Sequence, residues 1–202
     1  MRAAMLLLLP LLAFAGASPG RADERGHRCR FDGWASDPGR VGVEVRAGPS
    51  AEARLVGRLP PPEMDGEDPF GVAFRVVEAR NGWFRIREPY TWSQGPTPPF
   101  TLPEGWIEGR SLDFALQTDK AFEAPDPRSA VVATTWRASD GLHAFDYRSV
   151  SDCRGEWARL LVTGHDRRER PAWVRGVCGQ QATTCDGMQG DPIPHDEAPE
   201  HD

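Results

Sequence analysis

Four cysteines are the residues of this chain best suited to chemistry, whether as nucleophiles, metal ligands or disulfides. They are Cys29, Cys153, Cys178 and Cys185. A cysteine nucleophile needs a thiolate with a base nearby, and His143 and His165 flank Cys153 in the sequence. An even number of cysteines is typical of disulfides in an oxidising compartment, and an oxidised cysteine cannot attack a substrate. A cysteine hydrolase is therefore the least favoured function.

Two disulfides can pair these cysteines in three ways, and every pairing joins the two halves of the chain. Cys29 is the one cysteine of the N-terminal half, so its partner must lie in the C-terminal half. In the chain-entropy model, a disulfide that closes a loop of about 100 residues raises the free energy of unfolding by about 4.7 kcal/mol. Cys178 and Cys185 are spaced too widely for a zinc knuckle, and no histidine has a suitable spacing. We therefore expect disulfides and no metal.

The remaining polar groups do not form a catalytic pattern. Ser50 and Ser129 follow turn signals and lack the full Gly-x-Ser-x-Gly pattern of a nucleophile elbow. His195 and His201 lie among acidic residues near the C-terminus, where we expect solvation. Aspartates and glutamates fall mainly in predicted loops and in the same tail. The sequence predicts a protein that is not an enzyme and that uses no cofactor.

Aromatic residues in a long predicted loop, 88–104, are the best candidates for binding. They are Tyr90, Trp92 and Phe100. Aromatic rings supply contact area at low entropic cost, and loops on a rigid scaffold commonly carry function. The alternative is that these rings fold back and plug the open end of a small β-barrel.

The N-terminal segment 1–22 has the pattern of an export signal. Arg2 precedes an apolar run from Met5 to Ala15, and small residues follow at Ala15-Gly16-Ala17. The run is shorter than the roughly 20 residues that span a bilayer. We therefore expect cleavage, a periplasmic or secreted protein, and no membrane span afterwards. A formal net charge of −6 argues against a nucleic-acid partner.

The body of the chain reads as short strands separated by turns. Glycine and proline are frequent, at 21 and 19 of 202 residues, and no helical periodicity is convincing. After a lead-in segment, 23–40, that packs onto the first domain, alternating apolar residues predict strands over 41–45, 55–59, 70–76, 83–87, 106–108 and 112–114. The segment 60–69 reads as a loop rich in proline and acids. Asn81-Gly82 predicts a tight hairpin, after which Phe84 and Ile86 point inward and Trp83 and Arg85 outward.

The second half repeats the first weakly. Trp157 corresponds to Trp83 and Trp173 to Trp106, and the order of the surrounding blocks is kept. The two tryptophans are closer together in the second half than in the first, which fits a shorter loop there. This favours two tandem barrels, 41–114 and 119–179, over the alternative of one larger β-sandwich. The segment 186–202 is an acidic tail that we expect to be disordered.

The motifs resemble bacterial-type Src homology 3 domains. Val43-Glu44-Val45-Arg46 before Gly48-Pro49-Ser50 is similar to the first strand and turn of that family, with glutamate where asparagine is common. Gly82-Trp83 and Gly105-Trp106 are similar to its two tryptophan strands, with weaker matches in the second half. The resemblance implies all-β barrels of five or six strands that bind cell-wall peptides or protein partners and catalyse nothing.

The same resemblance identifies Trp83 and Trp157 as groove residues, because the first tryptophan lines the ligand groove in this fold. The alternative is that they pack against the neighbouring domain. The proline and tyrosine that complete a polyproline slot are replaced, so proline-rich ligands are not expected. The replacements are Glu108, Ser111, Arg175 and Cys178.

The sequence thus predicts an exported, disulfide-stabilised, non-catalytic binding module. Its expected ligand is a peptidoglycan stem peptide or an envelope protein. A periplasmic adaptor and a structural stabiliser of an envelope complex are the alternatives. The bond through Cys29 is expected to fix the two barrels as one rigid body.

Overall fold

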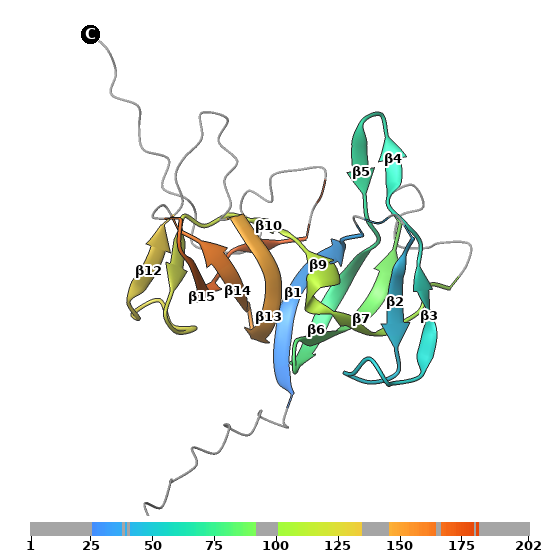
Figure 1. Ribbon diagram of the computed structural model, residues 1–202, viewed down its shortest axis with the longest axis horizontal. Coiled ribbons are helices and arrows are strands. Elements are labelled where there is room, and N and C mark those ends of the chain that lie inside the picture. Colours follow the sequence, from blue (N-terminus) through green and yellow to red (C-terminus); the bar gives the residue numbers. More distant parts are fainter. Residues whose placement is uncertain are drawn as a thin grey trace, which may run out of the picture.

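The chain is built from β-strands, as predicted. The computed structural model describes residues 26–37, 39, 41–91, 101–134, 146–164, 167–179 and 181 (Figure 1). These residues contain no α-helix and one turn of 3₁₀ helix, η1, at Gly109–Ser111, so none of their helices is long enough to cross a membrane. The expected signal, 1–22, and acidic tail, 186–202, lie outside the described residues.

Seven strands form the first sheet, in the order β3-β2-β8-β7-β6-β1-β9. Their bounds are β1 His27–Ala35, β2 Val43–Arg46, β3 Leu55–Leu59, β6 Ala73–Arg80, β7 Trp83–Tyr90, β8 Gly105–Glu108 and β9 Leu112–Asp113. The predicted hairpin joins β6 and β7, with φ of 53° at Asn81 and 78° at Gly82. Both values lie in the left-handed region that an Asn-Gly turn provides.

Alternation along β7 places the side chains as predicted. Phe84 and Ile86 are 0% exposed, whereas Trp83 and Arg85 are half-buried. Successive side chains of a strand point to opposite faces, so the apolar residues enter the core and Trp83 is left at the surface of the sheet.

Two segments that we expected as loops contain strands. The segment 60–69 holds most of a hairpin, β4 Glu63–Asp65 and β5 Asp68–Phe70, which projects from the first sheet (Figure 1). Gly66 supplies the turn, with φ of 63°. The long loop begins later than predicted because β7 continues to Tyr90 through a left-handed Glu88.

The second sheet has five strands in the order β12-β11-β15-β14-β13. Their bounds are β11 Lys120–Phe122, β12 Val131–Thr134, β13 Asp146–Arg154, β14 Trp157–Thr163 and β15 Glu169–Val174. A separate short antiparallel pair is formed by β10 Ala115–Leu116 and β16 Val177–Cys178. Among the described residues both sheets are open rows of strands, so the expected closure into barrels is not seen.

The central parts of the two sheets pair their strands in the same registers. Each central pairing in the first sheet has a counterpart in the second. The difference in residue number between counterparts is the same for β6 and β7, and it is smaller for β8. The counterparts are Val76↔Ile86 with Val150↔Leu160, Ala79↔Phe84 with Cys153↔Ala158, Phe84↔Ile107 with Ala158↔Val174, and Arg85↔Trp106 with Arg159↔Trp173. Even the register shift between Val76 and Glu78 recurs between Val150 and Asp152.

Strand β1, from the segment expected to be a lead-in, joins the two sheets. It pairs with β6 and β9 in the first sheet, and Figure 1 shows it between β6 and β13. On its other side the Arg30 N–H donates to the Gly155 carbonyl at 2.7 Å, and the Gly155 N–H donates to the Arg28 carbonyl at 2.8 Å. One continuous hydrophobic core includes buried residues of both sheets.

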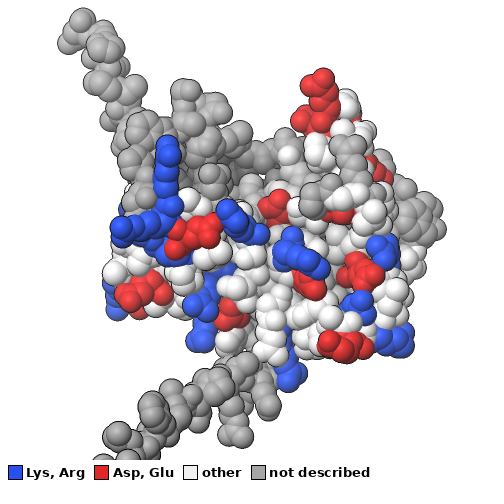
Figure 2. Space-filling view, viewed as in Figure 1, with Lys and Arg blue, Asp and Glu red and all other residues white. Residues whose placement is uncertain are grey.

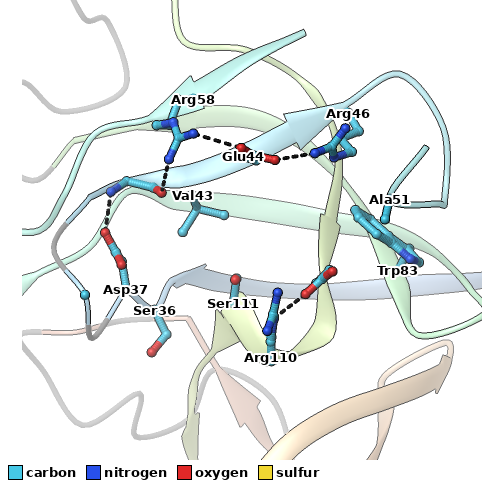
Figure 3. Close-up of a pocket in the computed structure, with 13 residues that line it drawn as sticks. Ser36, Asp37, Val43, Glu44, Arg46, Ala51, Arg58, Trp83, Arg110 and Ser111 are labelled. Atoms are coloured by element: carbon cyan, nitrogen blue, oxygen red, sulfur yellow. Dashed lines mark hydrogen bonds and ion pairs between the residues drawn. The ribbon is translucent and has the colours of Figure 1, made fainter. Parts of the chain in front are cut away.

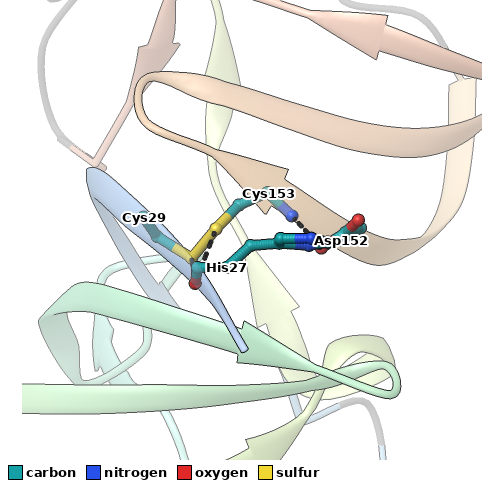
Figure 4. The surroundings of a disulfide bond; sticks show 4 residues. All are labelled: His27, Cys29, Asp152 and Cys153. Carbon is teal, nitrogen blue, oxygen red and sulfur yellow. Dashed lines mark hydrogen bonds and ion pairs between the residues drawn. A yellow bond between two sulfur atoms is a disulfide. The ribbon is translucent and has the colours of Figure 1, made fainter. Parts of the chain in front are cut away.

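A disulfide between Cys29 and Cys153 closes this junction, with the two Cα atoms 5.5 Å apart (Figure 4). The predicted bond from Cys29 to the C-terminal half is confirmed. Both cysteines are buried. Beside them, His27 Nδ1 lies 2.8 Å from an Asp152 carboxylate oxygen. Cys178 is also disulfide-bonded, and Cys185 lies outside the described residues. A disulfide of this kind indicates a non-reducing compartment.

Candidate functional site

A groove of about 490 Å³ lies on the first sheet, beside strand β2 and the start of β7. Its walls come from the segment after β1, from β2 and β3, from Trp83, and from η1 with the end of β8 (Figure 3). The lining residues are Ser36, Asp37, Gly39, Gly42, Val43, Glu44, Arg46, Ala51, Arg58, Trp83, Glu108, Arg110 and Ser111. This is the size range of a small-ligand site.

Trp83 provides the aromatic surface of the groove. It is the first residue of β7, directly after the Asn81-Gly82 turn, and it lies opposite Glu108 on β8. Figure 3 shows Trp83 and Ala51 at the end of the groove where Arg46 lies, with Asp37 and Arg58 at the other end. The local sequence explains the position: alternation turns Phe84 inward and leaves the indole half-buried at the groove.

Two arginines share one carboxylate in the wall formed by β2 and β3. Glu44 accepts an ion-paired hydrogen bond from Arg46, and its other oxygen accepts one from Arg58 at 2.8 Å. A second nitrogen of Arg46 donates to the Ala53 carbonyl at 2.9 Å. Because one carboxylate faces two guanidinium groups, this wall carries one positive charge in excess.

Acidic groups lie around the rest of the groove. Asp37 accepts a hydrogen bond from the Gly42 N–H, and no arginine or lysine of the described residues forms an ion pair with it. Glu108 pairs with Arg110, whose side chain is 77% exposed. Three arginines and three carboxylates therefore face the same space, as positive and negative regions rather than a field of one sign. Figure 2 shows the same interspersed charges over the wider surface, with acidic residues gathered on the β4–β5 hairpin.

The groove combines one indole with charged and small side chains. Its lining residues include no cysteine or histidine. In the described part of the chain, no cluster of three or more histidine, cysteine or acidic side chains could hold a metal ion. An indole face beside paired charges can hold an apolar segment and orient its charged ends.

Two of the predicted site residues, Tyr90 and Trp83, lie far apart. Tyr90 is the last residue of β7, about 23 Å along the strand from Trp83. Burial, and then the nearby Asp32 carboxylate, raise the pKa of Tyr90. Trp92 and Phe100 lie outside the described residues. The structure therefore does not bring Tyr90 and Trp83 into one site.

Trp157 occupies a different setting from Trp83. It begins β14 in the second sheet, and its ring meets the ring of Phe122 at 5.5 Å and 86°, an edge-to-face contact. Phe122 is itself buried, at 8% exposure. The residue predicted for a second groove therefore packs against a core phenylalanine.

Sequence reasoning missed the charged walls of the groove. Glu44 and Arg46 alternate with the buried Val43 and Val45 on β2, which places both at the surface. That alternation is enough to identify both residues as surface residues from the sequence. The contribution of Arg58 was not visible, because it depends on the β2–β3 register that sets it opposite Glu44.

No protein family, curated protein or solved structure matches this chain in the three comparisons made.

Proposed function

We propose that this protein is an exported, non-catalytic recognition module made of two copies of one β unit of the Src homology 3 type. The matching strand registers of the two sheets support the duplication, because independent sheets have no reason to share both offsets and the same register shift. The first copy extends over 41–114 and the second over 119–179, and β1 joins them.

The ligand of this module is a peptide bound in the groove at Trp83. The observation that carries the proposal is the groove itself: a half-buried indole beside a wall with excess positive charge and a carboxylate, Asp37, outside any described ion pair. A peptidoglycan stem peptide has the matching chemistry, because it carries free carboxylates and an amine around small aliphatic side chains.

Export fits the oxidised state of the protein. The Cys29–Cys153 bond belongs in a non-reducing compartment, and the segment 1–22 has the pattern of a signal that delivers a chain to one. The wall peptide and the envelope proteins both lie in that compartment. An acidic protein has no general attraction to the acidic wall polymer, so binding must come from the groove.

Sedimentation with purified peptidoglycan tests the proposal. The oxidised protein lacking the segment 1–22 should be retained in the pellet, and Trp83→Ala should reduce the retained fraction at least fivefold. Arg128→Ala, an exposed change on the second copy, is the control and should pellet like the parent. Equal retention of both variants would exclude the Trp83 groove, and no retention of the parent would exclude wall binding.

A periplasmic adaptor is the second candidate, and the interspersed surface charges favour it. If the parent protein stays in the supernatant, a pull-down from envelope extract should recover a protein partner with the parent and with Arg128→Ala, and not with Trp83→Ala. Recovery that is insensitive to Trp83 would count against the groove in this function as well.

A further inference from the structure

The turns after β2 and after β11 have the same backbone geometry, which fixes the equivalence of residues in the two copies. The same three backbone hydrogen bonds occur in both turns, at one constant displacement along the chain. The pairs are Ala47 N to Arg54 O with Glu123 N to Ala130 O, Ser50 N to Gly48 O with Asp126 N to Ala124 O, and Ala53 N to Ser50 O with Ser129 N to Asp126 O. The register shift between Val45 and Arg46 recurs between Ala121 and Phe122, at the same difference in residue number. Arg46 is therefore the counterpart of Phe122.

The tryptophan strands give the other equivalences. The pairing of Phe84 with Ile107 recurs as that of Ala158 with Val174, which makes Trp83 the counterpart of Trp157. By the same pairing, Arg175 is the counterpart of Glu108.

One equivalent position thus holds different residues in the grooves of the two tryptophans. At Trp83 that position holds Arg46, whose side chain is 22% exposed and lines the groove. At Trp157 it holds Phe122, whose ring meets the indole edge-to-face at 5.5 Å. An aromatic pair of this geometry is mutually attractive, so Phe122 occupies the space above Trp157 that a ligand would need.

The charges at the wall positions also differ in the second copy. Lys120 stands in place of Glu44, Thr134 in place of Arg58, and Arg175 in place of Glu108. Arg175 pairs with Glu156 at 3.3 Å, and Glu156 also pairs with Arg30 of β1 at 2.6 Å. These charges form an ion-pair contact between the second copy and β1.

We infer that Phe122 closes the second copy of the groove, so that the protein carries one functional groove of this type, at Trp83, and that the residue at the Arg46/Phe122 position decides whether a groove is open. The inference rests on the proposed function for the role of the open groove. Trp157 then serves packing, and each chain binds one peptide.

A ligand-free measurement tests the closure. The full oxidised chain is labelled with 5-fluorotryptophan, the Trp83 and Trp157 resonances are assigned with Trp83→Phe and Trp157→Phe, and a neutral nitroxide, TEMPOL, is titrated in while ¹⁹F line broadening is followed. Phe122→Ala should increase the broadening of Trp157 at least twofold, and Arg46→Phe should decrease that of Trp83 at least twofold. Phe122→Leu, which keeps the site apolar without a ring edge, serves if Phe122→Ala does not fold. Unchanged broadening of Trp157 in the folded variant overturns the inference.

Peptide binding tests the same inference through the groove. A disaccharide stem peptide from digested peptidoglycan is titrated into the protein by calorimetry, and we expect one site per chain. Arg46→Phe should weaken binding at least tenfold, while Trp157→Ala should change it less than twofold. Two sites, or equal losses in Trp157→Ala and Trp83→Ala, would overturn the single groove and leave the proposed function standing. If the parent does not bind, wall-peptide recognition fails, and the TEMPOL result alone decides the closure.

Discussion

The hydroxyl of Tyr147 shows how a single residue connects the two sheets. Tyr147 lies on β13 of the second sheet and donates a hydrogen bond to the Asp113 carboxylate, on β9 of the first. The Phe114 N–H donates to the same hydroxyl at 3.2 Å, and the rings of Phe114 and Tyr147 stack at 5.5 Å. A half-buried carboxylate at the junction is thereby given a donor.

Removing that donor should destabilise the protein. Tyr147→Phe keeps the ring packing and removes the hydroxyl's hydrogen bond to Asp113, which still accepts one from the Phe114 N–H at 2.8 Å. The net loss of one such hydrogen bond costs about 1 kcal/mol. Urea unfolding of the oxidised protein at pH 7 measures the change. An unchanged free energy of unfolding would mean that the hydroxyl contributes nothing at the junction.

The same residue predicts a pH dependence. Burial first, and then the Asp113 carboxylate, raise the pKa of Tyr147 above its ordinary value of 10.0. The phenol therefore ionises more readily in the unfolded chain, so its contribution is complete below about pH 10 and is lost as the pH rises further. Above that pH, the free energy of unfolding should fall by about 1.4 kcal/mol per pH unit more steeply in the parent than in Tyr147→Phe. Parallel curves for the two proteins would contradict this.

At the scale of elements, the alternation of apolar and polar residues predicted which side chains of a strand are buried. The pairing of the strands determined which surface residues lie together in one site. The valines of β2 and the phenylalanine of β7 identified the inner faces from sequence alone. Strand β1 was harder to recognise, because its buried positions include Gly33 and Ala35, whose small side chains give little apolar signal. The groove required the register between Glu44 and Arg58, and a register set by a turn and a bulge cannot be read from composition.

η1 illustrates how closely the elements of the two sheets approach. A Cβ atom at Gly109 would overlap the Val150 carbonyl oxygen and lie 2.8 Å from the Phe84 ring. Gly109→Ala should therefore destabilise the protein by about 1–3 kcal/mol, as overpacking does. Gly48→Ala, where the nearest atom would be 3.4 Å away, is the matched control and should be near neutral. Equal urea midpoints for the two variants would show that the sheets are not in close contact at η1.

At the scale of the whole molecule, β1 and its disulfide connect the two sheets. The bond closes a separation of 124 residues, and the surrounding core continues from one sheet into the other. Sequence reasoning predicted that a bond from Cys29 must join the halves, since the other cysteines all lie in the C-terminal half. The choice of Cys153 came from the fold, because β1 and β13 lie side by side.

Removing this bond should weaken the whole structure. Replacing Cys29 and Cys153 together by serine should lower the free energy of unfolding by about 4 to 5 kcal/mol, on the chain-entropy model for a loop of this length. Glu156→Gln removes the partly exposed ion pairs of Glu156 with Arg30 of β1 and with Arg175, and should cost no more than about 2 kcal/mol. If the double serine variant were as stable as Glu156→Gln in urea unfolding, the disulfide would not be what holds the halves together.

The most direct test of the account is to map where a stem peptide contacts the folded chain. A disaccharide stem peptide is titrated into ¹⁵N-labelled oxidised protein and amide and indole shifts are followed by NMR. We expect the largest changes at Gly42, Glu44 and the Trp83 indole, with little change at Trp157. Changes centred on Tyr90 or on the second sheet, with the Trp83 groove silent, would contradict it.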